Sequence, residues 1–309
     1  MLAVDPEKYK EFAEQTYETV SDSMRAAVLR SAQSDLPVLI MVGEHHLDIK
    51  QEREANKHTP DNMQNPASAA AFTEIATLEA AARLVGRDHM AFSMELPSDT
   101  LARLVSEIKD HNGTVPQNRQ HLPFMHTIAY AVNNNIAINP SDPGIDYRKT
   151  DPEQREQMQR DSVAALACDD DIRLVVHVGG VNHISNFSGY TNEEVQNAQG
   201  HLTRSEARDP FNGIYSETVF FNASHYSRDF LNDMKIPKNA ASYSETVYST
   251  NPRNAVQINA PGSIDRDTRA QIGEMVREAA QKHASGQSIG LLDGGQASTP
   301  DADAPIYKV

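Results

Sequence analysis

Apolar runs of strand length recur in the first two thirds of the chain, and each one stops at glycine, proline or an acidic residue. A short continuous apolar run bounded in this way is typical of a strand that is buried on both faces. Between the runs lie segments with apolar residues at helical spacing, such as Tyr9, Phe12 and Tyr17. Strands that alternate with helices indicate a parallel sheet with right-handed crossovers. The predicted strands of this part are 38–42, 89–94, 136–138 and 172–178.

The helical segments have recognisable ends. Pro66 stands near the first turn of one predicted helix and Gly86 follows its last turn, which is the usual placement of these residues. Between Asp48 and Asn65 the chain is polar and is expected to form a long loop over the end of the first strand. The predicted helices are 6–32, 66–85, 98–110, 123–134 and 151–167.

The character of the chain changes after about residue 190. The segments Tyr215–Val219 and Tyr243–Val247 share the sequence YSETV and alternate in strand fashion, so we expect them to pair or to lie adjacent in the sheet. A helix over 192–199, a short strand over 256–258 and a helix over 265–283 complete the prediction. From Ser285 the chain is rich in Gly, Ser, Asp and Pro, and is expected to be mobile.

These elements predict an α/β protein with a mainly parallel sheet flanked by helices, additional C-terminal strands and a terminal helix. We expect a single domain over residues 1–285, with a core over 36–190 and an elaboration over 191–285, followed by a mobile tail over 286–309. A length of 309 residues is sufficient for one such domain.

Composition narrows the class of protein. The formal net charge of −15 argues against nucleic acid or an anionic membrane surface as a partner. A single cysteine, Cys168, rules out an internal disulfide and a cysteine-rich metal site. No apolar stretch approaches the roughly 20 residues of a membrane helix, and the N-terminal residues lack the pattern of a classical secretory signal. We therefore expect a cytoplasmic protein, or one that is exported without a cleaved signal peptide.

The candidate chemistry stands at the ends of the predicted strands. The first strand is followed by Gly43-Glu44-His45-His46, the second by Glu95, the third by a turn that contains Asp142, and the fourth by Gly-Gly-Val-Asn-His ending at His183. Parallel strands bring their C-terminal ends to one edge of the sheet, where open α/β sheets bind ligands. We therefore expect these residues to meet there, although strand alternation allows only one of His45 and His46 to face the site.

Two imidazoles and two or three carboxylates allow three kinds of chemistry. They can act as general acid and base on water, hold a divalent metal through nitrogen and oxygen ligands, or bind haem through an axial histidine. Asp142 is as well explained by turn chemistry, and His177 by hydrogen bonding inside a buried strand. A nucleophile elbow is absent around Ser141 and Ser185, which disfavours a serine hydrolase.

The set of motifs VLIMVGEHHLD, MELP, IAINP and VVHVGGVNHI resembles the ChaN-like, erythromycin-esterase-like and TIKI/TraB-type superfamily, over about residues 36–190 and most closely the ChaN-like branch. The resemblance places the family histidine at His46, the second glutamate at Glu95 and the late Gly-x-x-His motif at Gly180–His183. It implies an α/β fold and often hydrolysis at a His/Glu site, metal-dependent in some branches and metal-free in others. For the ChaN-like branch it implies haem binding and iron uptake.

The sequence therefore favours a hydrolase that acts on an unidentified small-molecule or peptide substrate. Its expected catalytic residues are Glu44, His46, Glu95 and His183. The possible ligands of a divalent metal are His46, Glu95 and His183. Two alternatives stay open: a protein that binds haem or another iron ligand without catalysis, and an interaction or effector protein that acts through its C-terminal third.

Overall fold

A computed structural model describes residues 6–34, 37–44, 66–120, 122–144, 152–180, 217–222, 248–249, 256–257 and 270–290. The elements confirm the predicted alternation of strands and helices. The helices are α1 (Pro6–Ser34), α3 (Pro66–Val85), the 3₁₀ turn η1 (Arg87–His89), α4 (Ser98–Asp110), α5 (Pro123–Asn133), α7 (Pro152–Ala167) and α12 (Ile272–Gly290). The strands are β1 (Val38–Glu44), β2 (Met90–Pro97), β3 (Ile138–Asp142), β4 (Leu174–Gly180), β5 (Glu217–Asn222), β6 (Tyr248–Ser249) and β7 (Val256–Gln257).

The sheet is parallel through the strands that carry the motifs. Its order is β3-β2-β4-β1-β5-β6, with β7 pairing with β5 off this path. β3, β2, β4, β1 and β5 all run in the same direction, and only β6 is antiparallel to its neighbour among the described strands. The α/β fold predicted from the sequence is thus confirmed, and the C-terminal ends of β1 to β4 lie at one edge of the sheet.

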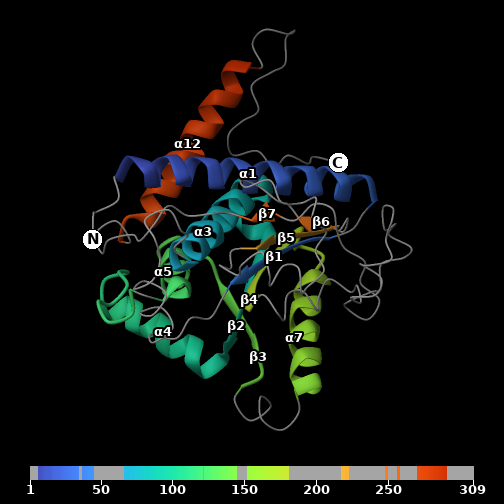
Figure 1. The fold of residues 1–309 in the computed structure, drawn as a ribbon. Helices are drawn as coiled ribbons and strands as arrows, with labels where there is room; N and C mark the ends of the chain where they lie inside the picture. The colour runs from blue at the N-terminus through green and yellow to red at the C-terminus, as the bar shows by residue number, and fades with distance from the viewer. Residues whose placement is uncertain are drawn as a thin grey trace.

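One face of this sheet packs against most of the described helices. Large apolar side chains at alternate strand positions join residues of α1, α3, α4, α5 and α12 in one hydrophobic cluster. Figure 1 shows these helices on one side of the strands and α7 standing apart on the other side. The strand residues on the clustered face are Val38, Ile40, Val42, Met90, Phe92, Met94, Leu174, Val176, Val178 and Phe221.

The second face of the sheet carries the intervening strand positions. Leu39, Met41, Ala91 and Val175 are buried there without joining the main cluster. The described helix that contacts this face is α7, which packs against β2, β3 and β4. Because neighbouring strand residues point to opposite faces, the two sides of the sheet have separate surroundings.

The third strand differs from its prediction. It was expected over 136–138 with a turn directly after it, whereas β3 runs from Ile138 to Asp142 through Asn139 and Pro140. Proline is tolerated because β3 is an edge strand of the sheet. Side chains also supply contacts to β2: Asn139 Nδ2 donates to the Phe92 carbonyl at 3.0 Å, and Ser141 Oγ donates to the Met94 carbonyl at 2.9 Å. Residues that favour a turn are thereby accommodated in a strand.

The C-terminal part contains additional strands and a terminal helix, as expected. β5 includes part of the first YSETV segment, whereas the second segment, 243–247, lies outside the described residues. α12 begins later than predicted and continues to Gly290, past the start of the expected tail. A helix that is anchored by buried residues such as Val276 can propagate beyond them. The predicted loop over 48–65, the predicted helix over 192–199 and residues 291–309 also lie outside the described residues.

Among the described helices, none combines the length and the apolar character that crossing a membrane requires.

Candidate functional site

The candidate site lies at the C-terminal edge of the sheet. In the register of the parallel pairs, Glu44 of β1 lies beside Gly180 of β4, and Pro97 of β2 lies beside Asp142 of β3. β4 separates β1 from β2 in the strand order. The last residues of four strands, distant in sequence, are therefore brought together by the pairing of the strands.

A buried arginine joins two of these strand ends. Arg155, in the first turns of α7, donates from Nη2 to Glu95 Oε1 at 2.6 Å and to Asp142 Oδ2 at 3.0 Å. Its Nε donates to Asp142 Oδ1 at 3.2 Å. The exposed fractions of the three side chains are 9% for Arg155, 3% for Glu95 and 0% for Asp142. One guanidinium thus pairs with two carboxylates that are both buried.

The charges of this cluster support one another. Burial alone would lower the pKa of Arg155, but the hydrogen bond with Asp142 and the charges of Glu95 and Asp142 outweigh it and raise that pKa above its usual value. The cluster therefore favours the charged form of the guanidinium. A buried ion pair stabilises a protein only if the attraction between its partners offsets the hydration that both have lost. This requires good hydrogen-bond geometry.

Glu95 is fixed on its other side by the end of β4. The backbone N–H of Gly180 donates to Glu95 Oε2 at 2.7 Å. The preceding Gly179 leaves the space that this carboxylate occupies, since a Cβ there would lie 3.0 Å from Glu95 Oε2 and 3.2 Å from His177 Nε2. The glycine at position 179 is therefore explained by the close approach of Glu95 and His177.

His177 belongs to the same polar face of the sheet. It is 1% exposed, and its Nδ1 lies 3.2 Å from Ser93 Oγ on the neighbouring strand β2. Its Nε2 faces the side of Gly179 on which Glu95 lies. Ser93, Glu95 and His177 thus form a continuous buried polar strip across β2 and β4, next to α7.

Gln159 extends this polar region along α7. It lies one turn after Arg155, is fully buried, and neither polar atom of its amide has a hydrogen-bond partner among the described residues. A buried amide without partners costs stability. Such a group calls for an explanation, for example a bound water, an ion or a role in function.

The structure separates the predicted site residues into three groups. Glu95 and Asp142 come together through Arg155. Glu44 is 3% exposed at the same edge, but strand alternation places it on the clustered face, with Val42 and Gly180, whereas Glu95 lies on the polar face. His45, His46 and His183 lie outside the described residues.

Sequence reasoning missed Arg155, Ser93 and Gln159. A signal for the helix residues was present: Arg155, Gln159 and Val163 follow one another at four-residue spacing, so they share a face of α7. Since Val163 is fully buried, that face contacts the sheet, and the two polar residues on it must be buried too. A signal for Ser93 was the alternation of large and small residues in MAFSME.

Glu95 is the one residue of the expected metal-ligand set that lies among the described residues, and its surroundings bear on that role. Both oxygens of Glu95 are engaged, one by Arg155 and the other by Gly180 N–H, so a metal at Glu95 would share a carboxylate that already binds a cation. Among the described residues, this edge contains no group of three potential metal ligands within reach of one ion. Glu95 therefore fits the role of a fixed anion better than the role of a metal ligand.

Comparison of the chain with protein-family models, with curated proteins and with solved structures finds no match. Function is accordingly inferred from the chemistry of the site.

Proposed function

We propose that the protein is a hydrolase whose site lies at the C-terminal edge of the sheet, with His46 and His183 as the acid–base residues. The observation that carries this proposal is the Arg155–Glu95–Gly180 connection, which fixes a buried carboxylate at the strand end from which the chain continues to His183.

Chain length supports a meeting of the two histidines at this edge. His46 follows the end of β1 by two residues, and His183 follows the end of β4 by three, so their Cα atoms can lie no further than about 8 Å and 11 Å from those ends. The two strand ends are register partners at the usual spacing of about 4.8 Å. Both histidines are therefore within chain reach of the same small volume.

The carboxylates take different roles in this proposal. Glu44 orients His46, or shares its role as general base, because it precedes His46 in the same short segment. Glu95 acts through its fixed negative charge, which favours a protonated imidazole nearby and so helps His183 to hold or donate a proton. A metal, where one is bound, would act by lowering the pKa of a water at His46 and His183.

The experiment is a turnover assay of the purified chain on a panel of carboxylic ester, amide and phosphoester substrates. His46→Ala and His183→Ala are each expected to lower kcat/KM by roughly 10²–10⁴ on any substrate that the wild-type chain hydrolyses. His111→Ala is the matched control, because His111 is an exposed histidine at the end of α4, and it should leave kcat/KM unchanged.

Two results would replace the proposal. A Soret band on addition of haem, lost in His46→Ala or His183→Ala and accompanied by no turnover, would assign the site to haem binding. Full activity in both histidine variants would refute the acid–base assignment. Elemental analysis of the purified wild-type chain and of the His46→Ala/His183→Ala double variant separates the metal-dependent form of the proposal, in which the double variant loses one equivalent of metal, from the metal-free form, in which it loses none.

A further inference from the structure

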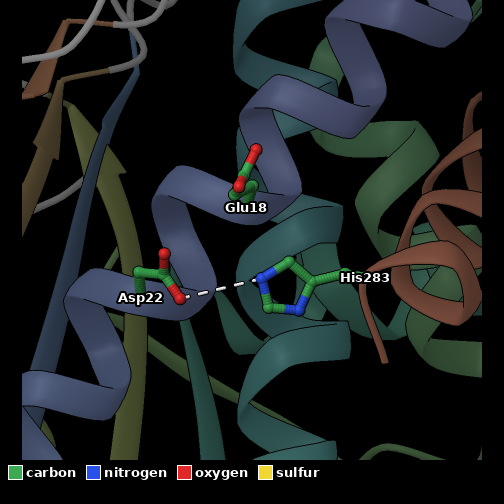
Figure 2. Close-up of side chains that lie close together, drawn as sticks. All are labelled: Glu18, Asp22 and His283. Atoms are coloured by element: carbon green, nitrogen blue, oxygen red, sulfur yellow. Dashed lines mark ion pairs between the residues drawn. The ribbon is translucent and has the colours of Figure 1, made fainter. Parts of the chain in front are cut away.

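A second cluster of ligating side chains lies far from the sheet edge, where α1 and α12 cross. Glu18 and Asp22 come from α1 and His283 comes from α12, and one potential ligand atom from each lies within 4.8 Å of the other two. Figure 2 shows the imidazole directed toward the carboxylate of Asp22, with Glu18 one turn away on the same helix. His283 Nε2 and Asp22 Oδ1 are 3.7 Å apart.

The helices place these groups for definite reasons. Residues four apart on a helix lie on one face, so Glu18 and Asp22 project from α1 side by side. On α12, His283 follows the buried positions Val276, Ala279 and Ala280, and its side chain is only 15% exposed. The edge of its ring packs against Tyr17, with ring centroids 5.6 Å apart and planes at 75°. The imidazole is thus oriented by packing, independently of any ion.

We propose that Glu18, Asp22 and His283 form a binding site for a divalent transition-metal ion, with Zn²⁺ as the best-fitting ion. One imidazole nitrogen and two carboxylate oxygens are a donor set that zinc accepts, with water completing the tetrahedron. An imidazole ligand lowers the affinity of the site for Mg²⁺ and Ca²⁺ relative to Zn²⁺, because Mg²⁺ and Ca²⁺ prefer oxygen ligands at every position.

The distances between the three potential ligand atoms are short enough for the side chains to close around one ion. Ligand atoms of a tetrahedral zinc lie roughly 3.3 Å apart, so the three groups must approach by about an ångström or slightly more. Glu18 and Asp22 are exposed and can rotate at little cost, whereas the half-buried His283 supplies the fixed point. The ion would link the first and the last described helix of the chain.

The same pair of helices offers a matched control. Lys282, the neighbour of His283, forms an ion pair with Glu14 of α1 at 2.5 Å. Lys282→Met removes a contact between α12 and α1 and leaves the three proposed ligands in place. It therefore separates a loss of zinc binding from a general loosening of the two helices.

The experiment is a calorimetric titration of the metal-free full-length chain with ZnCl₂, followed by thermal unfolding with and without zinc. We expect one equivalent to bind, and His283→Ala, Glu18→Gln and Asp22→Asn each to weaken that binding by roughly 100-fold, since even outer-shell partners are worth 10- to 100-fold. Zinc at a hundredfold excess over Kd should raise the wild-type Tm by roughly 5 °C, and should not raise it in His283→Ala. MgCl₂ should produce neither effect.

Further variants keep this proposal distinct from the proposed hydrolase. A His46→Ala/His183→Ala double variant and Lys282→Met should both retain the equivalent of zinc. Zinc binding that persists in Glu18→Gln, Asp22→Asn and His283→Ala, or that disappears only in the His46/His183 variant, would overturn the α1–α12 site. An absence of binding to the wild-type chain at millimolar zinc would overturn it as well. Glu18→Gln alters an exposed side chain, so it stays informative if His283→Ala does not fold.

Discussion

The two faces of the parallel sheet differ in how many polar side chains they bury. On one face, side chains such as Ile40, Phe92 and Val176 are fully buried in a continuous apolar cluster with α1, α3 and α12. On the other face, beside α7, the same strands bury Ser93 and His177. β2 shows the difference within one strand: its large apolar residues point to the clustered face, and the small and polar residues between them point to the polar face.

This difference in buried polar residues indicates that the two faces of the sheet have different roles. Apolar burial stabilises a fold at about 25 cal/mol per Å², whereas buried ion pairs contribute little net stability compared with apolar residues of the same volume. A fold that needed only stability would have apolar side chains at Glu95, Asp142 and Arg155. The polar face is therefore the place to search for function, and its charges should tolerate change poorly.

Removal of the arginine is expected to have the largest effect. Arg155→Met leaves Glu95 and Asp142 buried side by side without their shared cation, and should lower the free energy of unfolding by about 3–5 kcal/mol. Urea denaturation measures this loss. Arg277→Met is the control, because Arg277 pairs with Glu274 while both side chains are well exposed, and should cost at most about 1 kcal/mol. Equal costs in the two variants would contradict the role assigned to the buried cluster.

Neighbouring residues of β2 test the comparison within one strand. Phe92→Ala opens a cavity in the apolar cluster and should cost at least about 3 kcal/mol. Ser93→Ala, on the polar face, removes one hydrogen bond to His177 and should cost only about 1 kcal/mol. Urea midpoints of the two variants provide the comparison. A more costly Ser93→Ala would show that the polar face also carries the stability of the sheet.

Alkaline pH tests one of the buried polar contacts between the helices that cover the clustered face. Tyr130 of α5 donates from its hydroxyl to Glu79 of α3, and burial, followed by the charge of Glu79 and this hydrogen bond, raises the pKa of Tyr130 above its usual value of 10.0. Above pH 10 the unfolded chain loses this proton while the folded chain keeps it, so stability is lost as pH rises, by up to about 1.4 kcal/mol per pH unit.

Tyr130→Phe cannot lose that proton in either state. The difference in unfolding free energy between wild type and Tyr130→Phe should therefore shift in favour of the variant between pH 9 and pH 11. Denaturant titrations at both pH values measure it, and a difference that stays constant with pH would contradict the raised pKa.

The smallest expected effect is a gain in stability. Gln159→Met replaces a fully buried amide that lacks described partners with an apolar side chain of similar length, and should raise the free energy of unfolding by about 1 kcal/mol. Gln157→Met, which removes only an exposed contact with Asp161, should stay within about 0.5 kcal/mol of wild type. A marked loss of stability in Gln159→Met would mean that water or a bound ligand satisfies this amide.

The architecture was predictable because strand and helix periods are local signals. The four motif strands, their parallel arrangement and the positions of α3 and α4 follow from apolar runs and helix ends such as Pro66 and Gly86. The third strand was displaced because Asn139-Pro140-Ser141 has the local preference of a turn. Its pairing at the sheet edge, with side chains bonding to β2, depends on tertiary context that no local pattern contains.

The site was predictable in part. Glu95 and Asp142 were selected because they follow strands, and the sheet does bring them together. The arginine that joins them comes from the first half of α7, which is almost entirely polar, and the apolar residues that mark the buried face of this helix, Val163 and Ala164, lie near its end. The division of Glu44 and Glu95 between two faces follows from register, which requires the pairing of the strands.

The packing of α12 across α1 has a consequence for biosynthesis (Figure 1). α1 leaves the ribosome before the other described helices, yet part of its surface is covered by α12, the last described helix. Because non-local contacts form only after both partners exist, the part of α1 that α12 covers, which includes Tyr17, stays uncovered until α12 has been translated. A nascent chain halted before residue 270 should therefore be a good substrate for chaperones and proteases, although the sheet core is already complete in sequence.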